Sequence, residues 1–368
     1  MHSNSRVVFY GGSAWSTWSP TTLDEDGIGG SETALVRVAE ILAARGWSVE
    51  VYFDVFEGQV NGVEYLPIDR WEPADVPAAF VGFRRPDIFD REIACPVRVF
   101  WCHDAHLGDA LTPGQGREMT AVVAVSDWHR RLLAEQYPFL ATKLRTVRNG
   151  VSLRRATTGE PAFPDATASF AERAQRALYS SNPGYGLRVL LALWPEIRRR
   201  VPEAELHLYS DWEVYDRFVE ENHRLRAGKV MLLHLLAEAE AAGGVVSHGR
   251  VGQPELHRAM QRARVWSYTA IVDETGCIGA MEARAAGLAI VASERGALPE
   301  TVGRGRGIFV PLDDEERLRA DFVSAIAGLL SDEAAWTALH EKALEDVDAL
   351  DWSARSSDWE HVLELVER

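Results

Sequence analysis

Two glutamates with seven residues between them, Glu274 and Glu282, have the spacing in this sequence that points most directly to chemistry. They lie in the segment DETGCIGAMEARAAG, in which a helix is expected to begin around Gly276. A rise of 1.5 Å per residue places the carboxylates roughly 12 Å apart, wider than the about 5–9.5 Å of a glycosidase acid–base pair. Because a carboxylate accepts paired hydrogen bonds from vicinal hydroxyls, the two can hold hydroxyl-bearing groups on either side of a diphosphate.

The start of this helix is also suited to an anion. First-turn backbone N–H groups have no partner within the helix and bind phosphate, and Gly276 allows the backbone to approach such a group closely. Judged from these residues alone, the alternative is that both glutamates are solvated on a helix surface.

A second glycine-rich segment, GIGGSE, precedes a helix expected over 31–45. In this segment Gly29 and Gly30 permit close backbone approach, and Ser31 can cap the helix. Farther along, WCHDAH places His103 and His106 at a strand end. The two histidines are not expected to bind a metal, because no third ligand accompanies them on the loop.

Short apolar runs alternate with amphipathic stretches along most of the chain, an order that predicts parallel sheets with helices on both faces. Strands are expected at 6–11, 48–53, 97–100, 121–125, 144–148, 177–180, 205–209, 245–248, 265–268 and 289–292. Helices are expected at 31–45, 128–136, 187–201, 214–227, 254–263 and 279–286, and the acidic tail from 315 is expected to be mostly helical.

The alternation lapses over 152–175, which is polar and contains prolines, so a linker is expected there. The predicted fold class is α/β, with two Rossmann-like doubly wound domains at 1–151 and 176–345 and a cleft between them. Ligands of such folds bind at the carboxyl ends of the strands.

Composition excludes several function classes. The 39 basic and 55 acidic residues among 368 give a net charge of −16, which gives no support to a nucleic-acid partner. The three cysteines lack metal-ligand spacing, and no run approaches the about 20 apolar residues of a membrane span. The first residues lack a signal-peptide layout, so a cytoplasmic location is expected. No Gly-x-Gly-x-x-Gly follows the first strand, which disfavours a dinucleotide dehydrogenase.

The Glu-x7-Glu segment, followed by a strand and GALPE, resembles the retaining GT-B glycosyltransferases of family 4. The resemblance implies an N-terminal acceptor domain, a C-terminal nucleotide-sugar domain, and a C-terminal helix over 346–368 that returns to the N-terminal domain. It implies transfer of a hexose, without a metal or other cofactor, from a nucleotide-diphosphate sugar to a hydroxyl acceptor. That acceptor is a glycan, a lipid-linked sugar or a small molecule.

The resemblance also assigns site residues. Glu274 and His103 would act on the transferred sugar, and Glu282 would hold the ribose. Donor-binding residues would be Gly29, Gly30, Ser180, Ser181, Arg250, Thr275, Gly276, Cys277 and Glu282.

One stretch departs from the family pattern. Members usually carry an arginine and then a lysine, both on the diphosphate, near the start of the C-terminal domain. Here the stretch reads YSSNPGYGLRVLL, with Ser180 or Ser181 in place of the arginine and no lysine. Helix amides, hydroxyls or another cation must then neutralise the charge of the diphosphate. Arg250 is favoured as that cation over Arg188, because Arg188 is expected on a helix surface.

Two alternatives stay open. One is another GT-B reaction, such as epimerisation of a nucleotide sugar, which needs no acceptor. The other is a non-catalytic protein that binds nucleotide sugars.

Metal dependence gives the first test. Because helix amides, rather than an acidic metal motif, are expected to hold the diphosphate, turnover should persist in EDTA. Loss of activity in EDTA that Mg²⁺ or Mn²⁺ restores would contradict this phosphate site.

Overall fold

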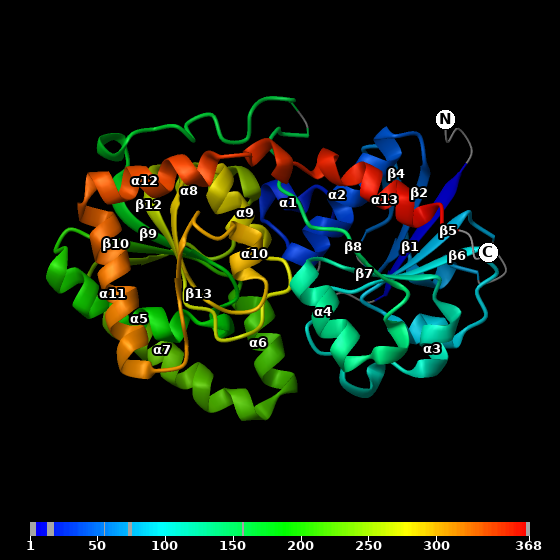
Figure 1. Ribbon diagram of the computed structural model, residues 1–368, viewed down its shortest axis with the longest axis horizontal. Coiled ribbons are helices and arrows are strands. Elements are labelled where there is room, and N and C mark those ends of the chain that lie inside the picture. Colours follow the sequence, from blue (N-terminus) through cyan, green and yellow to red (C-terminus); the bar gives the residue numbers. More distant parts are fainter. Residues whose placement is uncertain (1–4, 13–17, 55, 73–75, 157, 366–368) are drawn as a thin grey trace. The chain divides into compact units, whose positions relative to one another are not determined.

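The computed structural model describes residues 5–12, 18–54, 56–72, 76–156 and 158–365 (Figure 1). Contacts divide the chain into two compact units. Unit 1 comprises Met1–Leu23, Ile28–Gly150 and Leu350–Arg368, and unit 2 comprises Asp24–Gly27 and Val151–Ala349. A short helix, α1 (Thr22–Glu25), crosses the first boundary.

Unit 1 is built on an eight-stranded sheet in the order β3-β4-β2-β1-β5-β6-β7-β8, parallel except for the pairing of β3 with β4. Its elements are β1 (Arg6–Gly12), α2 (Gly30–Ala44), β2 (Ser48–Phe53), β3 (Gly58–Val60), β4 (Val63–Leu66), β5 (Ala79–Phe83), β6 (Val97–Trp101), α3 (Pro113–Glu118), β7 (Ala121–Ala124), α4 (Asp127–Gln136), β8 (Leu144–Thr146) and α13 (Ser356–Leu363).

The C-terminal helix α13 packs on unit 1. Glu360 accepts two hydrogen bonds from the Arg45 guanidinium, at 3.0 and 2.8 Å. Trp359 is fully buried, with its ring against those of Phe9 and Trp101. Large apolar contacts therefore join the end of the chain to its first strand.

Unit 2 is built on a six-stranded, all-parallel sheet in the order β11-β10-β9-β12-β13-β14. Its elements are β9 (Ala174–Ser180), α5 (Leu187–Arg200), β10 (Glu205–Tyr209), α6 (Trp212–Glu221), α7 (Arg226–Ala241), β11 (Val245–Ser247), α8 (Gln253–Arg262), β12 (Ala263–Tyr268), α9 (Ile278–Ala285), β13 (Ala289–Ser293), α10 (Leu298–Val302), β14 (Ile308–Val310), α11 (Glu315–Ser331) and α12 (Glu333–Leu344).

Helices cover both faces of this sheet. Figure 1 shows α8, α9 and α12 on one side, and α5, α7 and α11 on the other. The central strands β12 and β13 are consequently buried along their whole length, as expected of a doubly covered parallel sheet.

The segment 152–175, predicted as a linker, belongs to unit 2 and packs there. The buried Arg173 guanidinium donates to backbone carbonyls on several elements, including Ala263 at 3.0 Å and Ala286 at 2.8 Å. These bonds anchor the end of the segment before β9 begins.

The two Rossmann-like α/β sheets confirm the architecture predicted from the alternating pattern, and every predicted strand is present. The strands that were not predicted are β3, β4, β5 and β14. They are three to five residues long, and no pattern in the sequence marked them.

Four predictions about helix ends are wrong. The C-terminal helix expected over 346–368 is shorter: α13 spans Ser356–Leu363, and two 3-10 turns precede it. The single helix expected over 214–227 is two helices, α6 and α7, separated at Asn222, whose side chain accepts from the Arg224 backbone N–H. Helix α9 begins at Ile278, two residues after Gly276. The residue that caps α2 is Gly29 rather than Ser31.

No helix in the described part of the chain is long and apolar enough to cross a membrane.

Candidate functional site

At the carboxyl edge of the unit 2 sheet, a chain of hydroxyl groups leads to Glu274. Ser181 follows β9 and donates from Oγ to the Tyr268 hydroxyl at 3.1 Å, and Tyr268, the last residue of β12, donates to the Glu274 carboxylate. Burial raises the pKa of Glu274, and the hydrogen bond from Tyr268 partly offsets this rise. Ser181 and Glu274 were predicted to belong to one site, but no motif marked Tyr268, which connects them.

The loop between β13 and α10 fixes the backbone of Glu274. The Ala297 backbone N–H donates to the Glu274 carbonyl at 2.7 Å. Gly296 has a φ of +57°, and a Cβ atom there would overlap the Glu274 backbone nitrogen and oxygen. The GALPE motif therefore positions Glu274, because only glycine permits this approach.

The three residues that precede α9 are Thr275, Gly276 and Cys277. Cys277 is the N-cap residue, and its side chain forms no cap hydrogen bond. Burial raises the pKa of the Cys277 thiol, so the group is a neutral thiol rather than a nucleophilic thiolate. The first turn of α9 thus lacks the side-chain oxygen that a Ser, Thr, Asp or Asn cap would supply.

Glu282 lies in the interior of α9 and is 5% exposed. Its Oε1 accepts from Nε2 of His257 and from Nε2 of Gln253, both at 3.1 Å. Among the described residues, none donates a hydrogen bond to Oε2. The carboxylate is thus oriented by two donors from α8, which the sequence analysis did not identify.

Ser180 and Arg250 also lie at this edge of unit 2. Ser180 Oγ accepts from the Trp266 indole N–H at 3.0 Å, so its own O–H can still donate. Arg250 donates to Asp211 at 2.9 Å, and Asp211 also caps α6. Because this ion pair already offsets its charge, Arg250 meets less phosphate charge than a free arginine would.

Unit 1 holds the other predicted site residues. Gly29 and Gly30 begin α2, and a Cβ atom at Gly29 would overlap the Glu32 carboxylate. Glu32 lies 3.8 Å from the Arg84 guanidinium, which follows β5 and forms two hydrogen bonds with Asp104 at 3.0 and 2.6 Å. The glycines therefore begin a helix whose first carboxylate faces a charged cluster.

His103 follows β6 beside this cluster. Its ring lies against Trp101, at 4.8 Å between centroids, and Phe83, at 5.2 Å. Burial, reinforced by the positive charge of Arg84, holds the pKa of His103 well below its usual range. At neutral pH it is therefore an uncharged imidazole, suited to hydrogen bonding with a hydroxyl. His106 is exposed and contacts Gln136 at 2.9 Å.

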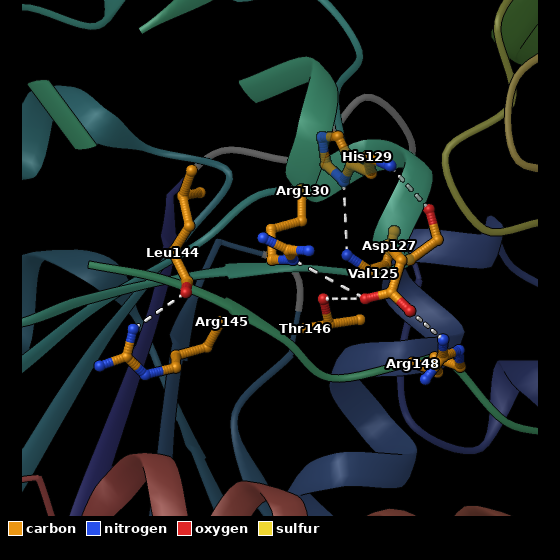
Figure 2. A network of polar contacts seen from close by, with 9 residues as sticks. Val125, Asp127, His129, Arg130, Leu144, Arg145, Thr146 and Arg148 are labelled. Atoms are coloured by element: carbon orange, nitrogen blue, oxygen red, sulfur yellow. Dashed lines mark hydrogen bonds and ion pairs between the residues drawn. The ribbon is translucent and has the colours of Figure 1, made fainter. Parts of the chain in front are cut away.

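A polar network ties the neighbouring strand ends together. Figure 2 shows Asp127, the first residue of α4, accepting from Thr146 at 2.7 Å and from Arg148 at 2.5 Å. These bonds hold the pKa of Asp127 below its usual range, with that from Thr146 contributing most. Asp127 thus fastens the start of α4 to the end of β8 and the residues that follow it.

His129 belongs to the same network and is completely buried. Its Nδ1 accepts from the Val125 backbone N–H at 3.3 Å, and its Nε2 lies 3.1 Å from the Asp104 carbonyl oxygen. Burial lowers the pKa of His129 to about 4. A neutral imidazole therefore links α4 to the loop that carries His103.

Among the described residues, no group of three or more His, Cys, Asp or Glu side chains is arranged to hold a metal ion.

Comparisons with known proteins agree with this architecture. Residues 176–332 match the family described as Glycosyl transferases group 1. The chain is 28% identical over 250 residues to phosphatidyl-myo-inositol mannosyltransferase of Mycolicibacterium smegmatis. That match covers 66% of this chain and 57% of the mannosyltransferase.

Solved structures extend the likeness over nearly the whole chain. Sucrose-phosphate synthase from Thermosynechococcus elongatus aligns with a TM-score of 0.69 and 16% identity, covering 97% of this chain and 98% of that one. Anabaena HepE, in complex with UDP and glucose, aligns with a TM-score of 0.68 and 14% identity, covering 98% and 99%. The fold class is GT-B, as predicted.

Substituting Gly296 tests how the loop holds Glu274. Gly296→Ala should lower the free energy of unfolding of unit 2 by about 2–4 kcal/mol, because strain at positive φ adds to the overlap with the Glu274 backbone. Gly305→Ala is the matched control: Gly305 also has a positive φ, of +88°, but a Cβ atom there meets nothing within 4 Å. Denaturant unfolding should show a loss of only about 1–2 kcal/mol for the control. Equal losses would mean that the approach of Gly296 to Glu274 has no energetic weight.

The buried His129 should make unit 1 sensitive to acid. Below pH 6.5 the unfolded chain binds a proton on this residue, whereas the folded protein binds it only near pH 4. Stability should therefore fall as the pH falls from about 6.5 to 4, by about 3 kcal/mol from this group. Urea unfolding of His129→Gln should show a shallower pH dependence over this window, and His106→Gln, at an exposed position, should keep the parent slope. An unchanged slope in His129→Gln would contradict the assignment.

Proposed function

We propose that this chain is a retaining, metal-independent GT-B glycosyltransferase that moves a hexose from a nucleotide-diphosphate sugar to a hydroxyl acceptor. In this proposal unit 2 binds the donor and unit 1 contributes His103 and acceptor contacts. The single observation that carries it is the orientation of Glu282, a buried carboxylate with one oxygen occupied and the other available.

Glu282 fits a ribose contact. A buried carboxylate is costly unless it is hydrogen-bonded, and donors from Gln253 and His257 meet that cost at Oε1. Oε2 then accepts from a ribose hydroxyl without any rearrangement of α8 or α9. Such preorganisation reduces the entropy lost when the donor binds.

The diphosphate would bind at the start of α9. The helix dipole and first-turn amides favour an anion there, and the N-cap residue Cys277 has no side-chain oxygen to form a strong cap. Ser180 supplies a hydroxyl donor, and Arg250 retains N–H groups beyond the one bonded to Asp211. These groups would replace the arginine and lysine that the family usually carries.

Glu274 and His103 would hold the sugar. Glu274 accepts sugar hydroxyls while Tyr268 and the Gly296 loop fix its position. The neutral His103 exchanges a hydrogen bond with a hydroxyl on the other side of the ring. No protein nucleophile is assigned: the leaving diphosphate accepts the proton of the attacking hydroxyl, and the protein contributes positioning and stabilisation of the diphosphate charge.

An acceptor-dependence assay tests the reaction class. Nucleotide sugars that raise the melting temperature would first be selected from a panel of nucleoside diphosphates and their sugars. A transferase should then release nucleoside diphosphate only when a hydroxyl acceptor is added. An epimerase would interconvert donor sugars without acceptor, and a binding protein would do neither; either result would overturn the proposal.

The two glutamates should separate kinetically. Glu282→Gln should raise the donor KM by about ten- to a hundredfold with kcat nearly unchanged, because a ribose contact is similar in ground and transition states. Glu274→Gln should act chiefly on kcat, by a comparable factor, because the sugar ring is where charge develops. Gln is preferred to Ala at position 282, since Ala would leave the buried His257 and the partly buried Gln253 without their acceptor.

Glu220→Gln provides the control, because Glu220 is exposed on α6, and both of its kinetic constants should stay within about twofold of the parent. If Glu274→Gln and Glu282→Gln also leave kcat/KM within about twofold, neither glutamate contacts the donor as proposed.

A further inference from the structure

One face of the unit 2 sheet carries polar residues where a parallel sheet normally carries apolar ones. Along β10, Leu206 and Leu208 are fully buried on one face, while Glu205, His207 and Tyr209 alternate with them on the other face, where His207 is also buried. Such faces are usually covered by helices and rich in aliphatic side chains. Core packing therefore does not explain these polar side chains, which are called the polar floor below.

A pocket of about 210 Å³ opens over this floor. Arg176, His207 and Tyr209 lie along its base with His248, which follows β11. Helix α8 forms a wall, with Glu255, Arg258 and Arg262 toward the pocket. None of the residues assigned to the donor site lines it, so the pocket is distinct from the edge at which Glu274 and Glu282 lie.

The polar side chains of the floor form hydrogen bonds with one another. Glu205 accepts from Arg176 at 2.7 Å and bonds His207 at 3.1 Å, and His207 in turn bonds His248 at 2.9 Å. The His248 ring also stacks on Tyr209, with centroids 4.5 Å apart and planes 3° from parallel. Burial lowers the pKa of His207 and of His248, so both are neutral at pH 7. The Arg176 charge is offset by Glu205.

The wall has charge that is not offset by an ion pair. Arg258 and Arg262 stand four residues apart on α8, a spacing at which like charges repel. Both are exposed, and among the described residues neither forms an ion pair or a side-chain hydrogen bond. With Glu255 on the same wall, Arg258 and Arg262 still leave an excess of one positive charge at the pocket. Guanidinium groups that line one pocket suit a tetrahedral oxyanion, which accepts several N–H donors at once.

We propose that this pocket binds the phosphate group of a small molecule, held between Arg258 and Arg262 over the floor of His207 and His248. The volume limits the ligand: about 210 Å³ is below the roughly 300–1,000 Å³ of sites for larger ligands, which favours inorganic phosphate or a sugar phosphate over a nucleotide sugar. The site does not depend on the proposed transferase activity, since it shares no residue with the donor site.

Calorimetric titration of the full chain with inorganic phosphate and, separately, with glucose 6-phosphate tests the site. The parent protein should bind at least one of them saturably, and the tighter of the two identifies the source of the phosphate group. The double variant Arg258→Ala/Arg262→Ala should bind at least about tenfold more weakly, because it removes both guanidinium groups. Absence of saturable binding by the parent below about 1 mM would overturn the proposal.

A matched control distinguishes specific binding by Arg258 and Arg262 from an effect of the protein's net charge. Arg199→Ala/Arg224→Ala removes the same charge from exposed positions of unit 2 outside the pocket and should leave the affinity within about twofold. Equal weakening in both double variants would show a net-charge effect and overturn the site. UDP serves as the donor-site probe: its affinity should be unchanged in Arg258→Ala/Arg262→Ala, whereas competition between UDP and phosphate would place the anion in the donor site instead.

Discussion

The buried carboxylate of Glu282 imposes the strictest physical requirement on the candidate site. A charge taken out of water must be met by donors, and here both donors come from one neighbouring helix, α8. The position of α8 relative to α9 is therefore fixed by a hydrogen-bonding need as well as by packing. Phe163, from the segment before β9, packs its ring against that of His257, with centroids 4.3 Å apart. The segment predicted as a linker thus supports the orientation of a site residue.

Close backbone approach is the second constraint on unit 2. Gly296 lets the loop after β13 lie directly on Glu274, and Gly186, which has a φ of +150°, lies against the carbonyl of Thr269. The loop between β12 and α9 is consequently held from both sides by backbone atoms. The ion pair of Asp273 with Arg295, at 3.1 Å, adds to this hold, so the carboxylate of Glu274 is kept in place without an ion pair of its own.

In unit 1, the loops at the strand ends are held in place mainly by charged side chains. Its strand ends are joined by Arg84, Asp104 and Asp127 through ion pairs and by His129 through neutral hydrogen bonds. The segments VSDWH (125–129) and RNGV (148–151) are joined directly, because Asp127 of the first accepts from Arg148 of the second. Their joint role is structural: they fasten α4 and the end of β8 around the loop of His103.

The sequence by itself determined the alternation of strands and helices, the division into two sheets, and the candidacy of the Glu-x7-Glu segment. These follow from periodicity and from local residue types, which are properties of neighbouring positions. Tertiary structure alone decided that His257 and Gln253 orient Glu282, that Tyr268 connects Ser181 to Glu274, and that Asp211 takes up the charge of Arg250. It likewise decided that α9 begins two residues late, since the loop before it is held by Gly296 and not by local helix signals. Such pairings join positions far apart in the chain, and which residues meet depends on strand order and helix crossing, which no local pattern encodes.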